Sequence, residues 1–111
     1  MKQYLNDEQT AKLIELGFEK PRALVDKYYD FDSETYAEVK AYSIGELMEI
    51  LFGWYFKQKT QSPDDPMIFY SVGLWRGQFA VNVIEDEYVH NKELIDALFD
   101  TLVKLKEEGV I

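Results

Sequence analysis

Apolar residues recur every three or four positions near the end of the chain, which is the spacing of one face of an α-helix. The stripe consists of Leu94, Ile95, Ala97, Leu98, Phe99, Leu102 and Leu105. We predict a helix over residues 92–108, with Asn91 as its N-cap and Gly109 as the residue that ends it.

A shorter helix is predicted near the N-terminus, over residues 7–16. Asn6 and Gln9 have the spacing of a capping box, in which each side chain accepts a hydrogen bond from the other residue's backbone N–H. Gly17 stands where a left-handed residue ends a helix, and Phe18 is placed to fold back onto the last turn as in a Schellman motif.

The middle of the chain carries the most complete helix start. Ser43 and Glu46 are spaced as a second capping box, and Tyr42 and Leu47 as the hydrophobic staple that accompanies one. Together these four residues predict a helix over residues 44–52.

Strand patterns follow that helix. Gly53 breaks the helical pattern, and residues 54–59 are aromatic and alternating, which predicts a strand. Residues 67–75 and 78–84 are rich in Val, Ile, Phe and Tyr and predict a hairpin. Its turn is Arg76-Gly77, where the glycine supplies a positive φ.

Residues 20–41 admit two predictions. A proline near the start of the segment can open a short helix. Alternatively, the segment is an extended, aromatic hairpin that turns at residues 30–33. We favour the hairpin because Ala37, Val39 and Ala41 alternate with charged residues, as in a strand.

These elements predict one α+β domain over residues 1–111: an antiparallel sheet of about four strands with three helices packed on one face. With 111 residues and 47% hydrophobic content, the chain can bury a core without disulfides. It has no Cys, which excludes a thiolate nucleophile and a Cys-ligated metal. No apolar run approaches the ~20 residues of a membrane span and no signal peptide is visible, so we expect a cytoplasmic protein without membrane contact.

The net charge of −9 narrows the choice of partners. A strongly acidic chain repels phosphate groups, so we expect no direct nucleic-acid binding. The acidity either keeps the protein soluble or attracts a basic protein partner.

Candidate chemistry lies just before the last helix. His90 is the single histidine, and Glu85, Asp86 and Glu87 precede it. A small hydrolase or ligand-binding site would use His90 with one of these carboxylates. Catalysis needs positioned partners that the pattern does not show, so a loop histidine after a solvated acidic connection is favoured.

Two other patterns lead to no site. Trp54 and Trp75 can stack on single-stranded nucleic acid, but no basic groove accompanies them, so core packing or a partner surface is favoured. Asp30, Asp32 and Glu34 are spaced like the start of a calcium loop, but the sixth and twelfth positions lack the required Gly and Glu. We predict no metal and no cofactor.

Four segments carry a resemblance. They are Leu-x-Glu-Leu-Gly-Phe at residues 13–18, Ala-Tyr-Ser-Ile-Gly-Glu-Leu at 41–47, Glu-Leu-x-x-Ala-Leu at 93–98 and Glu-Gly-Val-Ile at 108–111. In this layout the chain resembles small uncharacterised α+β proteins encoded in bacterial prophages and mobile elements. The resemblance rests on helix caps and core positions, and it implies no catalytic residues.

We therefore expect a non-enzymatic protein that acts through protein–protein contact, with a basic partner or as a homodimer through exposed strands. Two alternatives stay open. One is a DNA mimic that inhibits a nucleic-acid enzyme, and the other is the small hydrolase or ligand-binding domain that uses His90 and its neighbouring carboxylates.

Overall fold

The computed structural model describes residues 1–58, 68–84 and 87–109, and the side chains of most of them. It confirms the α+β class, with three helices and five strands in the described part. In chain order the elements are α1 (Asp7–Glu15), β1 (Ala23–Asp30), β2 (Thr35–Ala41), α2 (Ile44–Gln58), β3 (Ile68–Trp75), β4 (Gln78–Ile84), β5 (Glu87–Asn91) and α3 (Leu94–Glu107).

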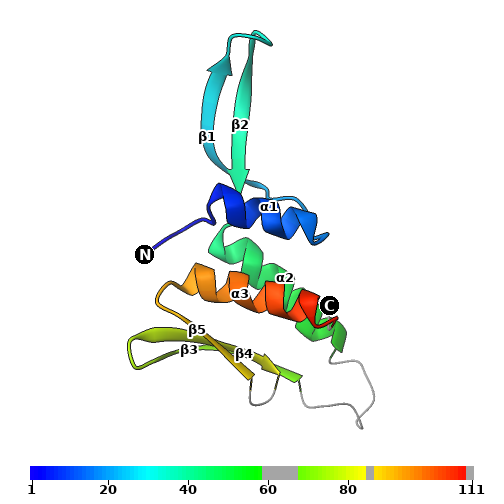
Figure 1. Ribbon diagram of the computed structural model, residues 1–111, viewed down its shortest axis with the longest axis vertical. Helices are drawn as coiled ribbons and strands as arrows, with labels where there is room; N and C mark the ends of the chain where they lie inside the picture. The colour runs from blue at the N-terminus through cyan, green and yellow to red at the C-terminus, as the bar shows by residue number, and fades with distance from the viewer. Residues whose placement is uncertain (59–67, 85–86, 110–111) are drawn as a thin grey trace.

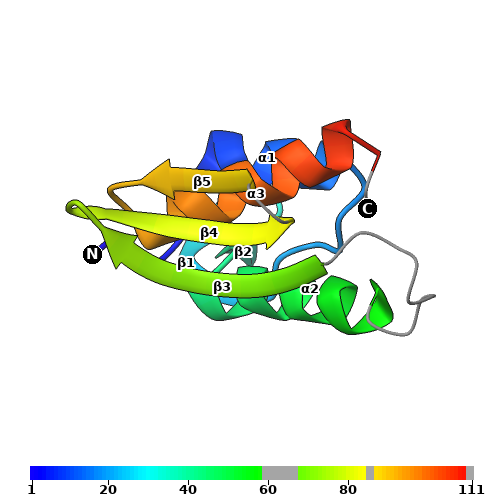
Figure 2. The same cartoon turned by 90° about the horizontal axis from the view of Figure 1, so that it is seen from below.

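The three helices form the middle of the molecule (Figure 1). α2 and α3 lie against one face of the sheet β3–β4–β5, and Figure 2 shows that sheet from its other side with the helices behind it. α1 lies on the far side of the helix pair, and the β1–β2 hairpin projects beyond α1. This projection makes the molecule elongated, with extents of 58, 33 and 19 Å.

One apolar core joins the helices to the three-stranded sheet. The predicted stripe of the last helix faces it, which confirms that pattern. The buried cluster comprises Leu5, Leu13, Tyr42, Leu47, Leu51, Val81, Ile95, Ala97, Leu98, Leu102 and Leu105. No residue of β1, and of β2 only its last residue Ala41, is buried.

The predicted ends of α1 are confirmed. Asn6 accepts from the Gln9 backbone N–H at 2.8 Å, and the Gln9 side chain accepts from the Asn6 N–H at 3.1 Å. Gly17 has a φ of 93°, and the Phe18 N–H donates to the Leu13 carbonyl at 3.1 Å. These bonds satisfy backbone groups that a helix end otherwise leaves open.

The N-terminal segment is tied to the start of α3. The Lys2 ammonium donates to Asp96 at 2.8 Å and to Gln9 at 2.9 Å, and the Gln9 amide also donates to Asp96 at 2.8 Å. The Lys2 backbone N–H donates to Glu93 at 3.0 Å. Burial alone would raise the pKa of Asp96, but the hydrogen bonds from Lys2 and Gln9 and the Lys2 charge hold it below its ordinary value.

The β3–β4 hairpin is also confirmed. Trp75 pairs with Gln78, so Arg76 and Gly77 form a two-residue turn in which both have positive φ, 52° and 78°. That geometry matches the twist of the flanking strands.

The prediction of a single sheet of about four strands is wrong. β1 and β2 form a sheet of their own, and β3, β4 and β5 form the other. The strand β5 was not predicted, because its acidic start has the composition of a connection. β5 pairs antiparallel with β4, and its central residue Val89 lies opposite Val81. Because β5 is the edge strand of the sheet, the polar residues on either side of Val89 are tolerated.

The predicted strand over residues 54–59 is wrong as far as the structure describes it, because α2 continues to Gln58. Gly53 costs a helix only about 1 kcal/mol relative to Ala. Positions 47, 51 and 54 are four and three residues apart, which is the spacing of one helix face. Because α2 also packs against both α3 and β3, the helix is favoured over the strand that the local pattern predicts.

The N-terminus of α3 differs from its prediction by two residues. Glu93, not Asn91, occupies the N-cap position and makes no side-chain cap. Asn91 ends β5, and its side chain accepts from the Glu93 backbone N–H at 3.1 Å. Gly109 ends the helix with a φ of 72°, as predicted.

Candidate functional site

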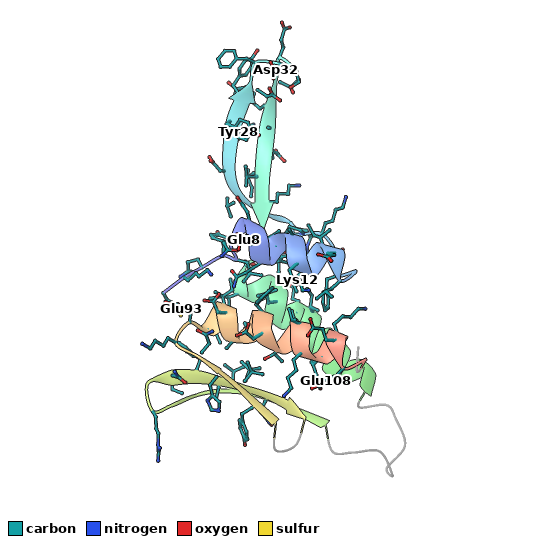
Figure 3. All side chains as sticks on the ribbon, in the orientation of Figure 1. Glu8, Lys12, Tyr28, Asp32, Glu93 and Glu108 are labelled. Carbon is teal, nitrogen blue, oxygen red and sulfur yellow. The ribbon has the colours of Figure 1, made fainter. Side chains whose placement is uncertain are left out.

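The β1–β2 hairpin, residues 23–41, is the part of the molecule that stands apart from the core, and we call it the arm. Its two strands pair from Ala23 with Ala41 at the base to Asp30 with Thr35 at the tip. Among the described elements, β1 and β2 contact each other extensively and the rest of the fold only slightly. Figure 3 shows Tyr28 half-way along the arm and Asp32 at its tip, both remote from Glu8 and Lys12 on α1.

The arm carries large apolar side chains that nothing in the described structure covers. Six of the eleven exposed large hydrophobic residues of the described chain lie on it, although it contains fewer than a quarter of the residues whose burial is described. They are Leu24, Val25, Tyr28, Tyr29, Phe31 and Tyr36. Phe31 at the tip is 83% exposed and Tyr36 is 65% exposed. Such clustering differs from the scattered single exposed residues of an ordinary monomer.

Three rings form a cluster on one face of the arm near its tip. Tyr29 and Tyr36 are directly paired across the strands, with ring centroids 5.4 Å apart and planes at 78°. The Phe31 ring lies 4.9 Å from Tyr29 at 79°. Edge-to-face contacts of this kind satisfy the ring quadrupoles and hold the rings in place. We call Tyr29, Phe31 and Tyr36 the tip cluster.

Cations and carboxylates are distributed unevenly along the arm. Lys27 Nζ lies 5.0 Å from the centroid of the Tyr36 ring, in a cation–π contact. Between Lys27 and Lys40 the chain has no basic residue, but it has four acidic ones, Asp30, Asp32, Glu34 and Glu38. The tip is therefore negatively charged, whereas the base is mixed.

The base of the arm is fixed to α2 by Glu46. Its two carboxylate oxygens accept from the backbone N–H groups of Arg22 and Ala23, at 2.9 and 3.0 Å. The Arg22 guanidinium in turn donates to Glu49 at 2.7 Å. A largely buried carboxylate with two N–H donors is a strong anchor, so the direction in which the arm leaves the core is set by α2.

This anchor corrects the predicted capping box at the start of α2. One half is confirmed, because the Glu46 N–H donates to the Ser43 hydroxyl at 3.2 Å. The other half is wrong, since the Glu46 carboxylate bonds Arg22 and Ala23 instead of returning to Ser43. Tyr42 and Leu47, the predicted staple, both lie in the buried core.

A cavity of about 270 Å³ opens beside the base of the arm. It is lined by Glu19, Lys20, Arg22, Tyr42, Glu46, Glu49 and Ile50. Burial, and after it the charges of Glu46 and Glu19, raises the pKa of Tyr42 above its ordinary value. The Tyr42 hydroxyl donates to the Glu19 carbonyl, so it adds a hydrogen bond between the core and the segment that leads into the arm.

His90, the histidine considered for catalysis, belongs to the three-stranded sheet and not to the arm. His90 is in β5 rather than in a loop, so that prediction is wrong. Its side chain is exposed, and its ring stacks on Tyr88 with centroids 6.1 Å apart. Glu85 and Asp86 lie outside the described residues, as does the side chain of Glu87. A pairing of His90 with one of these carboxylates stays a prediction.

The two tryptophans are placed by their backbones alone. Trp54 lies in α2 and Trp75 at the end of β3, and their side chains fall outside the described part. Among the described residues no group of His, Asp and Glu side chains could hold a metal ion. In the same part of the chain, no helix combines the length and the apolar character that crossing a membrane requires.

The sequence contained a signal for the arm that the strand pattern alone did not reveal. Tyr28 and Tyr29 are adjacent in a strand, so their side chains point to opposite faces. A strand that packs one face on a core leaves one of two such neighbours in solvent. Two large rings on opposite faces, followed by a third at the turn, therefore indicate a ribbon exposed on both sides.

The comparisons with known proteins give this chain no relative. No family model matches it. No protein of curated description and no solved structure matches it either. The function must therefore be argued from the arm and its surroundings.

Proposed function

We propose that this protein is a non-enzymatic module that binds a protein partner through the tip of the arm. The observation that carries the proposal is the tip cluster, three exposed aromatic rings on a ribbon with few contacts to the core. Aromatic residues dominate the energetics of protein interfaces, because they bury a large area with little loss of conformational entropy.

The position of the arm supports the same proposal. An isolated two-stranded ribbon is marginally stable in water, and the cross-strand pair of Tyr29 and Tyr36 helps to stabilise it. Phe31 belongs to no strand pair and is 83% exposed, so most of its surface is available to a partner. The anchor at Glu46 keeps the ribbon pointing away from the core. A partner therefore has access to both faces and both edges of the arm.

The partner is a protein rather than a nucleic acid. The chain has a net charge of −9, and the arm has four carboxylates between its two lysines. Phosphate backbones are repelled by such a surface. We therefore expect duplex DNA to show no binding at physiological salt. We also propose that the protein works in the cytoplasm, since its sequence shows neither a membrane span nor a signal peptide.

Affinity capture from the native host tests the proposal with three baits. They are the wild type, the tip variant Y29S/F31S/Y36S, and the control L74S/Y88S, which removes exposed apolar side chains from the three-stranded sheet. We expect one protein to be retained by the wild type and the control and lost from the tip variant, and the same pattern with the two purified proteins. Equal retention by all three baits, or loss only from the control, would place the interface elsewhere.

A further inference from the structure

We infer that the tip of the arm receives a cationic segment of the partner, one rich in arginine or lysine. The inference rests on the proposed function and adds the chemistry of recognition to it. It combines two features near the tip of the hairpin. One is a ring, Tyr36, that already has an ammonium group over its face, and the other is a set of carboxylates that belong to no ion pair within the described part of the chain.

The first feature is the contact between Lys27 and Tyr36. Lys27 Nζ lies 5.0 Å from the ring centroid, so the Tyr36 face is oriented toward a positive charge. Tyr29 stands nearly perpendicular to both Tyr36 and Phe31. The cluster therefore presents ring faces in more than one direction, and Phe31, the most exposed of the three, contributes a face with no cation over it in the described structure.

The second feature is the charge around Phe31. Asp30, Asp32 and Glu34 flank it in the turn, and none of them belongs to an ion pair among the described residues. Asp30 accepts from the Asp32 backbone N–H at 3.0 Å, which fixes the turn and leaves carboxylate oxygens facing solvent. A guanidinium stacked on a ring of the tip cluster would lie beside these carboxylates.

A second copy of the chain is a poorer occupant than a basic segment. In a two-fold contact with the tips at the axis, tip carboxylates would meet tip carboxylates; away from the axis, the tip would meet another surface of a chain whose net charge is −9. Two cations near the base are already engaged, Lys40 with Glu38 at 3.8 Å and Arg22 with Glu49 at 2.7 Å. Charge complementarity therefore favours a foreign cationic segment over self-association.

The probe for this inference is a peptide with four arginines separated by Gly-Ser pairs. Its counterpart carries uncharged citrulline at the same positions, which keeps the shape and removes the charge. Binding is measured by fluorescence anisotropy at about 0.15 M salt, where exposed charges more than ~8 Å apart are largely screened. We expect the arginine peptide to bind and the citrulline peptide not to bind.

The most discriminating variant is Lys27→Gln, which removes the ammonium group that lies over the Tyr36 ring. Its matched control is Lys106→Gln, because Lys106 makes the same kind of contact with Phe18, at 5.7 Å, on the main body of the fold. Both variants change the net charge equally. We expect K27Q to bind the arginine peptide about threefold more tightly than K106Q, since it alone frees a ring of the tip cluster.

Loss of the rings or the carboxylates gives the opposite result. We expect Y29S/F31S/Y36S to weaken binding about tenfold at unchanged net charge. The variant D30N/D32N/E34Q should weaken it more than the control E8Q/E15Q/E108Q, which neutralises three exposed carboxylates on α1 and at the end of α3. Because F31S alters only one exposed side chain, it serves as the test if the triple variant does not fold.

Three outcomes would overturn the inference. The first is that K27Q and K106Q bind the arginine peptide equally tightly. The second is that D30N/D32N/E34Q and E8Q/E15Q/E108Q weaken its binding equally. Either result would show that only the net charge of the protein matters. The third is a wild type that sediments as a dimer while the tip variant sediments as a monomer, which would make a second copy the occupant. The proposed function survives any of these if the captured protein still depends on the tip, and fails separately if it does not.

Discussion

In the helices and the three-stranded sheet, the side chains of Leu13, Leu47 and Leu98 have no exposed surface. In the arm, Tyr28, Phe31 and Tyr36 are each more than half exposed. We refer to the first region, all described residues outside 23–41, as the body. Residues of similar hydrophobicity are thus used for stability in the body and left available in the arm.

This contrast separates the side chains that stabilise the fold from those that the fold leaves exposed. The body has its own core and its own polar ties, such as the one between Lys2 and Asp96, so it does not need the arm's side chains. The arm depends on the body for its attachment at Glu46 but contributes little buried surface in return. Changes in the two regions should therefore affect different measurements.

The largest effect on the free energy of unfolding is expected for Leu98→Ala in the body. Leu98 is fully buried, and truncating such a leucine costs about 2–5 kcal/mol through lost transfer energy and the cavity that remains. Urea unfolding followed by circular dichroism measures the change. A loss below that of Leu24→Ala, at a half-exposed position of the arm, would contradict the division into a stabilising body and an exposed arm.

The next effect is expected for Glu46→Gln, at the junction of the two regions. The amide keeps one acceptor oxygen for the N–H groups of Arg22 and Ala23 but loses the charge, so we expect about 1–2 kcal/mol of destabilisation. Faster hydrogen exchange at these two amides would locate the effect at the anchor. Glu49→Gln is the control: Glu49 is 70% exposed and solvent screens its ion pair with Arg22, so we expect a smaller loss of stability than for Glu46→Gln.

A smaller effect is expected from the titration of Asp96. Its pKa is lower in the folded state than in the unfolded chain, so its ionised form stabilises the fold. That contribution is complete above the unfolded pKa of about 3.9 and is lost as the pH falls through the lower folded value. The stability of D96N, measured by urea unfolding from pH 7 to pH 2, should therefore fall less steeply across that window than that of the wild type. Parallel curves would show that Lys2 and Gln9 do not stabilise the carboxylate.

The smallest effect on stability is expected for Phe31→Ser at the tip. The side chain is 83% exposed, and surface substitutions usually change the free energy of unfolding by less than about 0.5 kcal/mol. The same variant should nevertheless lose the captured partner. If F31S destabilises the protein as strongly as L98A does, Phe31 belongs to the folding core and the arm is not a separate surface.

Local patterns determined the elements whose ends are fixed by neighbouring residues. The capping box of Asn6 and Gln9, the left-handed Gly17 and the Arg76-Gly77 turn were all predicted correctly, because each is satisfied within a few residues of chain. The prediction of the buried face of α3 was also correct, because apolar residues spaced three or four apart within one segment lie on one helix face.

The candidate site was accessible to sequence reasoning only in part. The favoured hairpin over residues 20–41 was correct, but His90, the histidine considered for chemistry, lies in a strand of the other sheet. A strand pattern gives the alternation of side chains along a ribbon, and it does not say whether either face meets a core.

The sequence by itself determined both ends of α1, the Arg76-Gly77 turn and the amphipathic face of α3. Only the tertiary structure decided that Glu46 holds the start of β1, that α2 continues through Gly53, and that the arm pairs with no other strand. The physical reason is the range of the interactions. Caps and turns are closed by hydrogen bonds between near neighbours, whereas the pairing and covering of strands depend on contacts between residues that are distant in the chain.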